Sequence, residues 1–341
     1  MNCKAKPMVV LLATAGPAER LQETLKSLSE CQFPESFRET IVVENGPRSG
    51  MAELLAEHSE LLRIRHVYVA EPNKSMALNQ AIEALDDCLI YFIDDDVRFG
   101  PQVLMEYAAA ALDKPGFYYG GPTSVDYQAR PPDWLIPYLP PSARGWSPSV
   151  RWVSPRRALE INACDACVES VDLDVPVFRG FNWAAFSEDV KRAGGFNPDR
   201  GPGARTNATG QEMDMQSRLI AIGVRGKYLS RARVWHYVPT SRCTPKWTLQ
   251  RAYRDGVGRG LSEQHADTFL GFPIVLLARV IALLSVLLMT RSKYDPVARF
   301  ELRLRIRYLL GYRKGLRLRP APPLPAQGHW NGSVWCTSCR S

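Results

Sequence analysis

Three consecutive aspartates follow a short apolar run, and this pattern does most to limit the folds open to the chain. The run spans residues 88–93, Cys-Leu-Ile-Tyr-Phe-Ile, and Asp94, Asp95 and Asp96 come directly after it. Continuous apolar runs of this length are typical of central strands in a parallel sheet. In open α/β sheets the ligand crevice lies at the carboxyl ends of such strands. The pattern therefore predicts that these carboxylates line a ligand site.

Neighbouring carboxylates repel each other, and this repulsion points to a cation. At about 6 Å and an effective dielectric near 20, one pair costs roughly 3 kcal/mol. A divalent cation removes that cost, and hard cations prefer oxygen ligands. A solvated acidic turn is the structural alternative, and an isolated Asp-Asp pair would favour it. Together with the motifs below, the pattern favours a site for Mg²⁺ or Mn²⁺ that carries a diphosphate.

Apolar strands and amphipathic helices alternate over the first 120 residues. Strands are expected at 8–13, 40–43, 64–69, 89–93 and 117–120, with a helix in each interval. This alternation predicts an α/β fold with a Rossmann-like, mostly parallel sheet flanked by helices. Further along, a strand pair is expected around Gly180, at 177–186, and a helix at 211–222.

The last third of the chain has a different composition. Residues 269–290 form the longest apolar run, and 291–319 hold ten lysines and arginines against only Asp295 and Glu301. The net charge of the whole chain is +8, so this segment accounts for all of it. Because the basicity is local, it argues against a general nucleic-acid-binding surface, and no nucleic-acid partner is expected.

Three arrangements are open for the apolar run: a helix packed on the preceding α/β domain, a transmembrane helix, and an interfacial or re-entrant helix. Residues 273–289 would form a helix about 26 Å long, whereas a bilayer core is roughly 30 Å thick. Arg279 lies near its middle, where a charge is costly. We therefore favour an interfacial helix, assisted by the arginines of 291–319 at an anionic membrane surface.

Several motifs, in their order along the chain, resemble the family 2 glycosyltransferases, which have the GT-A fold. These motifs are Asn45–Gly46, Pro72–Asn73–Lys74, the three aspartates, Gly194–Gly195–Phe196, Gly210–Gln211–Glu212–Met213–Asp214 and His236. The resemblance covers about residues 7–260. It implies an enzyme that transfers a sugar from a nucleotide-sugar donor to an acceptor hydroxyl.

The resemblance also implies roles for individual residues. Donor contacts fall on Thr14, Glu44, Lys74, Asn79, Asp94 and Asp95, and the metal ligands are Asp96 and His236. Glu212 stands at the position of the catalytic base, with Asp214 as the reserve candidate. Gly180, Asn182 and Trp183 are expected to bind the acceptor.

The chemistry of these residues agrees with an inverting transfer. A bound cation neutralises the diphosphate leaving group, the donor carbon passes through an oxocarbenium-like state, and one carboxylate activates the incoming hydroxyl. Processive relatives carry Gln-x-x-Arg-Trp, which Gln250–Arg254 does not match, so transfer of one sugar is expected. A sugar-1-phosphate nucleotidyltransferase would need a basic, glycine-rich loop after the first strand, and residues 13–17 lack the basic side chains. A non-catalytic, membrane-bound scaffold on the same fold remains the second alternative, although the aspartates and Glu212 are all present.

These observations divide the chain into a catalytic domain at 1–260, a membrane-associating helical region at 261–319 and a flexible tail at 320–341. Eight cysteines without a dense framework suit a reducing compartment. We therefore expect a peripheral or monotopic protein on the cytoplasmic face of the inner membrane. Its acceptor would be lipid-linked or a saccharide, in cell-surface polysaccharide or glycolipid synthesis.

Overall fold

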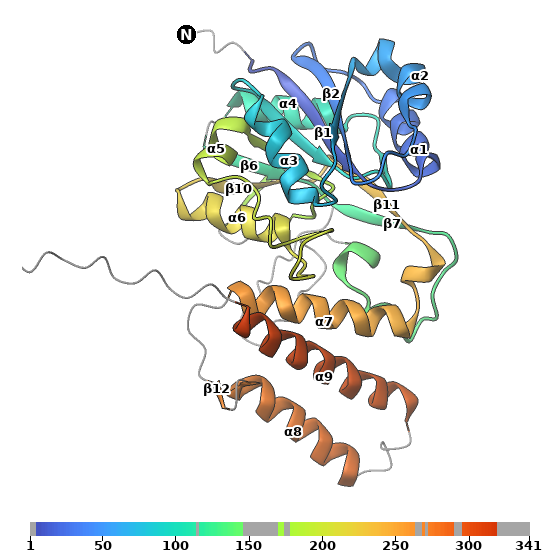
Figure 1. The fold of residues 1–341 in the computed structure, drawn as a ribbon, viewed down its shortest axis with the longest axis vertical. Coiled ribbons are helices and arrows are strands. Elements are labelled where there is room, and N and C mark those ends of the chain that lie inside the picture. Colours follow the sequence, from blue (N-terminus) through green and yellow to red (C-terminus); the bar gives the residue numbers. More distant parts are fainter. Residues whose placement is uncertain are drawn as a thin grey trace, which may run out of the picture.

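The computed structural model describes residues 5–113, 116–145, 170–173, 178–262, 268–269, 272–289 and 295–318. An α/β part occupies the top of Figure 1, and a stack of C-terminal helices lies beneath it. Residues 146–169, 174–177 and 319–341 lie outside the described residues, and the expected tail is among them.

A mixed sheet of eight strands forms the centre of the α/β part. Its strands are β1 (Met8–Thr14), β2 (Phe37–Asn45), β3 (Ile64–Val69), β4 (Leu89–Ile93), β6 (Phe117–Gly120), β8 (Ser170–Leu173), β9 (Trp183–Phe186) and β10 (Arg225–Leu229). They lie in the order β3-β2-β1-β4-β9-β6-β10-β8. The first four in this order are mutually parallel, and β9 runs antiparallel to both β4 and β6.

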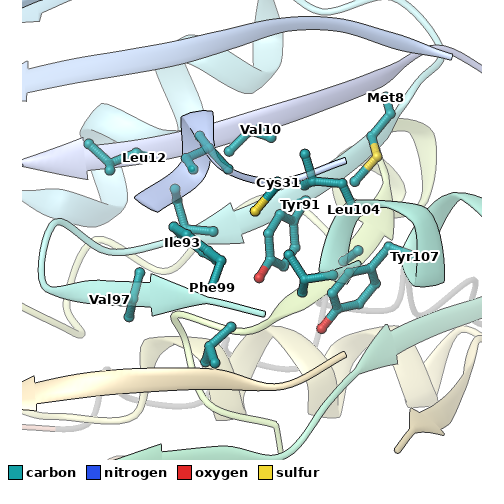
Figure 2. Packing of buried hydrophobic residues seen from close by; sticks show 14 of the residues in the cluster. Met8, Val10, Leu12, Cys31, Tyr91, Ile93, Val97, Phe99, Leu104 and Tyr107 are labelled. Carbon is teal, nitrogen blue, oxygen red and sulfur yellow. The ribbon is translucent and has the colours of Figure 1, made fainter. Parts of the chain in front are cut away.

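Helices cover both faces of the sheet because its buried strands carry apolar side chains on both sides. The helices are α1 (Ala18–Ser29), α2 (Ala52–Leu62), α3 (Lys74–Glu83), α4 (Val103–Asp113), α5 (Ser187–Arg192) and α6 (Gln211–Ala221). Met8, Val10 and Leu12 of β1 share one apolar core with α1, α2 and α4, whereas Val9 and Leu11 share another with α3, α5 and α6. Figure 2 shows the first core, where Tyr91 of β4 lies beside Tyr107 of α4.

A second, three-stranded sheet lies beyond the carboxyl end of β4. It consists of β5 (Val97–Phe99), β7 (Thr123–Tyr127) and β11 (Val234–Val238) in the order β5-β11-β7. Three short 3-10 turns flank it: η1 (Ile136–Tyr138), η2 (Pro141–Ala143) and η3 (Thr240–Arg242). Because β5 begins directly after the three aspartates, this small sheet lies next to them.

The C-terminal helices pack by close backbone contact. They are α7 (Pro245–Ser262), α8 (Ile274–Met289) and α9 (Pro296–Arg317), with a short hairpin of β12 (Thr268–Phe269) and β13 (Phe272–Pro273) before α8. A Cβ atom added at Gly311 of α9 would lie 2.0 Å from the carbonyl oxygen of Tyr253, and one added at Gly256 of α7 would lie 2.1 Å from that of Tyr308. Only glycine allows this approach. In Figure 1, α9 lies between α7 and α8.

The predicted fold class is confirmed, and the five strands expected in the first 120 residues are present. The expected strand pair at 177–186 is wrong in its first half, since only Trp183–Phe186 is a strand. The N–H of Asn182 bonds to the carbonyl of Arg179 and closes a turn there. The predicted domain boundary at residue 260 falls inside α7.

Apolar side chains of α8 are exposed along the helix. Val275, Ile281, Leu288 and Met289 are exposed to 57%, 55%, 66% and 78%. Among the described residues, no helix combines the length and the apolar character needed to cross a bilayer.

Candidate active site

The ends of β1 and β4 bring the first predicted site residues together. The two strands are parallel neighbours, with Leu12 opposite Ile93, so Thr14 and the aspartates lie at one edge of the sheet. The hydroxyl of Thr14 donates a hydrogen bond to Asp95, and the N–H of Gly16 donates to the Thr14 oxygen at 3.2 Å. Burial, followed by the charge of Asp96, raises the pKa of the Asp95 carboxyl. Asp95 is therefore held against β1.

Lys74 neutralises part of this acidic edge. It begins α3, and its ammonium group forms an ion pair with Asp94. Burial lowers the pKa of Lys74, but the charges of Asp94, Asp95 and Asp96 outweigh burial, so that its pKa is raised. A cation in contact with the strand end is what a diphosphate needs, and the position agrees with the predicted role of Lys74.

Asp96 faces two basic side chains from the segment that follows β10. Nε2 of His236, on β11, lies 3.3 Å from Oδ1 of Asp96, and Arg242 of η3 donates to Oδ2 at 3.2 Å. Burial raises the pKa of Asp96, but His236 and Arg242 overcome this effect and lower it to about 2. The predicted pairing of Asp96 with His236 at one site is thus present in the structure.

The orientation of His236 suits a metal ligand. Its Nδ1 lies 2.7 Å from the carbonyl oxygen of Ser142, which fixes Nδ1 as the protonated nitrogen, and its ring stacks on Phe181. In the neutral ring Nε2 then carries a lone pair, which faces Oδ1 of Asp96, an oxygen without a hydrogen bond among the described residues. Two lone pairs facing each other require a proton or a cation between them.

Asp96 and His236 fit a divalent cation as two of its ligands. In the described part of the chain, three or more His, Cys, Asp or Glu side chains do not gather into a complete metal site. Magnesium is commonly bound by one or two carboxylates together with substrate phosphates, so an incomplete protein site is what this chemistry needs. The donor set present here therefore fits a cation that arrives with a diphosphate.

Glu44 lies near the end of β2 in a buried position with several hydrogen-bond partners. It is 2% exposed, and its carboxylate accepts hydrogen bonds from the backbone and hydroxyl of Ser49 and from His66 at 3.1 Å. Burial raises its pKa, but these contacts with Ser49 and His66 prevail and lower it. These contacts hold the Glu44 carboxylate in place, and its contact with the nucleobase stays a prediction.

Asn79 holds a turn of the backbone, and its contact with a nucleotide stays a prediction. Its amide clamps the backbone of Phe196, accepting from the N–H at 2.6 Å and donating to the carbonyl at 2.8 Å. Both hydrogen-bonding ends of the side chain are used by this turn. Asn79 therefore positions the Gly194–Gly195–Phe196 motif.

The two candidate bases at the start of α6 differ in their surroundings. Asp214 forms ion pairs with Arg200 at 3.2 Å and with Arg218 at 2.9 Å. Glu212 forms no ion pair or hydrogen bond within the described residues and lies against Gly180, where an added Cβ would be 3.5 Å from its carboxyl carbon. Of the two carboxylates, Glu212 is thus the one available to an acceptor.

A chain of contacts ties Glu212 to the acidic edge. Gln211, next to Glu212, accepts a hydrogen bond from Ser75 at 3.0 Å. Ser75 follows Lys74, which pairs with Asp94. The start of α6 and the start of α3 therefore meet beside the aspartates, at the same site.

Two predicted acceptor residues lie in the core, so their assignment is wrong. Asn182 and Trp183 are both 0% exposed. The Asn182 amide accepts from the hydroxyls of Tyr91 and Tyr107 and donates to the carbonyls of Pro122 and Ala232, and Trp183 stacks on Phe92. Gly180 remains beside Glu212, where an acceptor could approach.

Sequence reasoning missed two arginines of the site. Arg242 bonds to Asp96, and Arg179 lies close enough to Glu212 for that charge to act on its pKa. Burial lowers the pKa of Arg179 to about 10. Arg179 directly precedes the predicted residue Gly180, and Arg242 follows the predicted residue His236 by a few positions. This closeness in sequence was the one signal that could have pointed to them.

Solved structures with a similar fold include glycosyltransferases. The mannosyltransferase PcManGT from Pyrobaculum calidifontis, in complex with GDP-Man and Mn²⁺, is 18% identical, with a TM-score of 0.54 over 92% of this chain and 88% of that one. GalNAc-T7 with UDP, GalNAc and Mn²⁺ is 11% identical, with a TM-score of 0.50 over 76% of this chain and 51% of that one. At these identities the likeness concerns the fold, which is GT-A.

A protein-family model also matches part of the sequence. Residues 9–167 match the model of glycosyl transferase family 2. The matched segment is slightly less than half of the chain, and together with the fold it supports one conclusion: the protein is a glycosyltransferase. No curated protein sequence matches it significantly.

Proposed function

We propose that this protein transfers one sugar from a nucleotide-sugar donor to an acceptor hydroxyl, with inversion at the anomeric carbon. The observation that carries the proposal is the meeting of Thr14, Lys74, Asp96, His236 and Arg242 at one strand end, beside Glu212. Acidic and basic groups alternate there, as a diphosphate with its cation requires. PcManGT with GDP-Man and Mn²⁺, and GalNAc-T7 with UDP and Mn²⁺, support the choice of donor and of metal.

The donor's diphosphate is held by this chain's cationic side chains. Asp96 and His236 would hold Mg²⁺ or Mn²⁺, which supplies Lewis-acid stabilisation of the leaving diphosphate. Lys74 and Arg242 now pair with Asp94 and Asp96, and both can turn their donors toward phosphate oxygens when a cation takes over the carboxylates. Thr14, at the end of the neighbouring strand β1, bonds to Asp95, and the two orient the nucleoside.

Glu212 acts as the base in this proposal. Its carboxylate takes the proton of the acceptor hydroxyl, while the oxygen forms a bond to the anomeric carbon and the bond from that carbon to the diphosphate breaks. The ion pairs of Asp214 with Arg200 and Arg218 support Glu212 over Asp214. Glu212 serves as the base and forms no covalent bond to the sugar, so direct displacement by the acceptor oxygen inverts the anomeric centre.

The C-terminal helices support a place at an anionic membrane surface, on the cytoplasmic face of the inner membrane. The exposed apolar side chains of α8 suit the headgroup boundary, and the exposed arginines of α9, among them Arg303 and Arg307, suit acidic lipids. A role in cell-surface polysaccharide or glycolipid synthesis follows from this position.

The test is calorimetric titration with UDP-, GDP- and dTDP-sugars in the presence and absence of Mn²⁺. One donor is expected to bind with Mn²⁺ and to lose most of its affinity in EDTA. Product analysis by proton NMR should then show an inverted anomeric centre. Absence of metal-dependent binding for every donor would overturn the proposal.

A further inference from the structure

A cavity of about 600 Å³ lies beside the candidate active site, between the C-terminal helices and the 3-10 turns of residues 136–143. Side chains from α7, α8 and α9 line it together with Tyr138 and Pro140. Its volume is in the range of small-molecule sites, roughly 300–1,000 Å³. None of the roles proposed above uses this cavity.

The α7 wall of the cavity adjoins the candidate base. Asp255, which lines the cavity, accepts a hydrogen bond at 2.6 Å from the hydroxyl of Thr209, just before Glu212 in the chain. A Cβ added at Gly258 of α7 would lie 2.5 Å from the Thr209 carbonyl oxygen, so the helix packs directly on this loop. Arg179 precedes Gly180, which lies against Glu212, and the charges of Glu212, Arg251 and Asp255 all act on its pKa.

Arg251 and Arg305 line the cavity, and the charge of Arg251 acts on further buried arginines. Burial lowers the pKa of Arg144, Arg179 and Arg254, and the charge of Arg251 lowers those of Arg179 and Arg254 further. In the described part of the chain, Glu212 and Asp255 are the carboxylates that act on Arg179 in return. The buried Nε of Arg179 has no hydrogen-bond partner among the described residues. Such a cluster is stabilised by an anion.

Arg251 has a fixed orientation that suits the binding of an anion. Its Nε donates to Asp255 at 2.8 Å, one helical turn further along α7, which fixes the guanidinium plane at the cavity wall. Its two Nη nitrogens make no hydrogen bond within the described residues, and a guanidinium edge of this kind binds phosphate oxygens in pairs.

The remaining lining is mostly apolar, apart from Thr248 and Arg305, which is paired with Glu301. Leu304 and Tyr308 of α9, Val280 of α8 and Tyr138 contribute carbon surface. Val280 belongs to the helix whose other apolar side chains are exposed, so the cavity adjoins the surface that we propose to contact lipid. A free saccharide gains little from such walls, whereas an alkyl or isoprenoid chain gains about 0.8 kcal/mol for each buried CH₂.

We infer that this cavity is the acceptor site, and that the acceptor is a lipid-linked saccharide phosphate. Its phosphate lies against Arg251 and the adjoining arginines, its lipid chain lies along Leu304, Tyr308 and Val280, and its sugar hydroxyl reaches Glu212. This inference rests on the proposed function, because it names the acceptor of the same reaction.

Calorimetry on the full-length protein with geranyl phosphate, geraniol and inorganic phosphate tests the inference. Geranyl phosphate is expected to bind, with geraniol and inorganic phosphate each at least about tenfold weaker, because each lacks one half of the complementarity. Arg251→Gln should weaken the binding of geranyl phosphate by about tenfold or more and leave the binding of geraniol unchanged. The matched control is Arg259→Gln, an exposed arginine of α7 outside the cavity lining, with affinity equal to wild type.

Ala252→Phe, which adds a ring to the cavity lining, should abolish binding of geranyl phosphate while the circular dichroism spectrum is kept. If that variant does not fold, Arg251→Gln decides alone. Equal binding of geraniol and geranyl phosphate, or wild-type binding by Arg251→Gln, would overturn the inference. Donor titration of the wild type separates the two proposals: metal-dependent donor binding without geranyl phosphate binding sinks only this one, and the reverse result sinks the proposed function.

Discussion

The α/β part and the C-terminal helices of this protein are stabilised by different contacts. In the α/β part, alternating apolar side chains of buried strands fill one core on each face of the sheet. Between α7 and α9, glycines such as Gly256 and Gly311 bring backbone against backbone. The first region holds rigid, paired charges at a strand end, and the second carries exposed apolar side chains and a local positive charge. In our proposals the chemistry belongs to the first region and the handling of the acceptor to the second.

The sharpest test of this division is Asp96→Ala, which removes the carboxylate between His236 and Arg242. Loss of a metal ligand should cost several kcal/mol of transition-state stabilisation, or about 10³-fold in kcat/KM. EDTA should reduce wild-type activity to a similar level. The measurement is the rate at which the sugar of a radiolabelled donor is transferred to the natural acceptor in a cell extract. Unchanged turnover in the variant, together with indifference to EDTA, would place the chemistry elsewhere.

The second test concerns the base at the border of the two regions. Glu212→Gln keeps the shape of the side chain and removes its basicity, so kcat should fall by at least about 10²-fold with KM for the donor unchanged. The control is Asp214→Asn, which breaks ion pairs to Arg200 and Arg218 and should mainly lower the melting temperature. A crippled Asp214→Asn beside an active Glu212→Gln would reverse the assignment.

The third test acts on the helices alone. In Gly311→Val the new side chain would meet the carbonyl of Tyr253, 2.0 Å from its Cβ, and overpacking of this kind costs about 1–3 kcal/mol. Hydrogen exchange should rise in α7 and α9 and stay unchanged in β1 and β4. Arg307→Ala, an exposed change on the same helix, is the control and should leave exchange as in the wild type. Equal loss of protection in β1 would show that the two regions unfold together.

The sequence predicts the α/β part well because its signals are local. Apolar runs mark β1 and β4, and the residues at their ends, Thr14 and Asp94–Asp96, meet because parallel strands end at one edge. The small strands β5 and β7 escaped prediction, since three to five residues with mixed exposure leave no periodic pattern.

Contacts between distant segments could not be read in the same way. Asn182 looks polar and available in the sequence, yet four hydrogen bonds from the core enclose it. Arg242 reaches Asp96 across 146 positions of sequence. The role of the glycines of α7 and α9 in helix packing becomes visible only when both helices are placed together.

The smallest expected effect tests the membrane side of the comparison. Arg303 and Arg307 of α9 are exposed, and each basic side chain near an anionic leaflet contributes about 1 kcal/mol, which is about fivefold in affinity. Arg303→Gln and Arg307→Gln should each weaken binding to phosphatidylserine vesicles by that factor at low salt, and less at high salt because exposed charges are screened. Arg231→Gln, an exposed arginine of the α/β part, should bind as the wild type does. Flotation of full-length protein with vesicles measures all three. Equal losses for Arg231 and Arg307 would mean that net charge, not the face formed by the helices, governs membrane binding, and the division between the two regions would fail on that side.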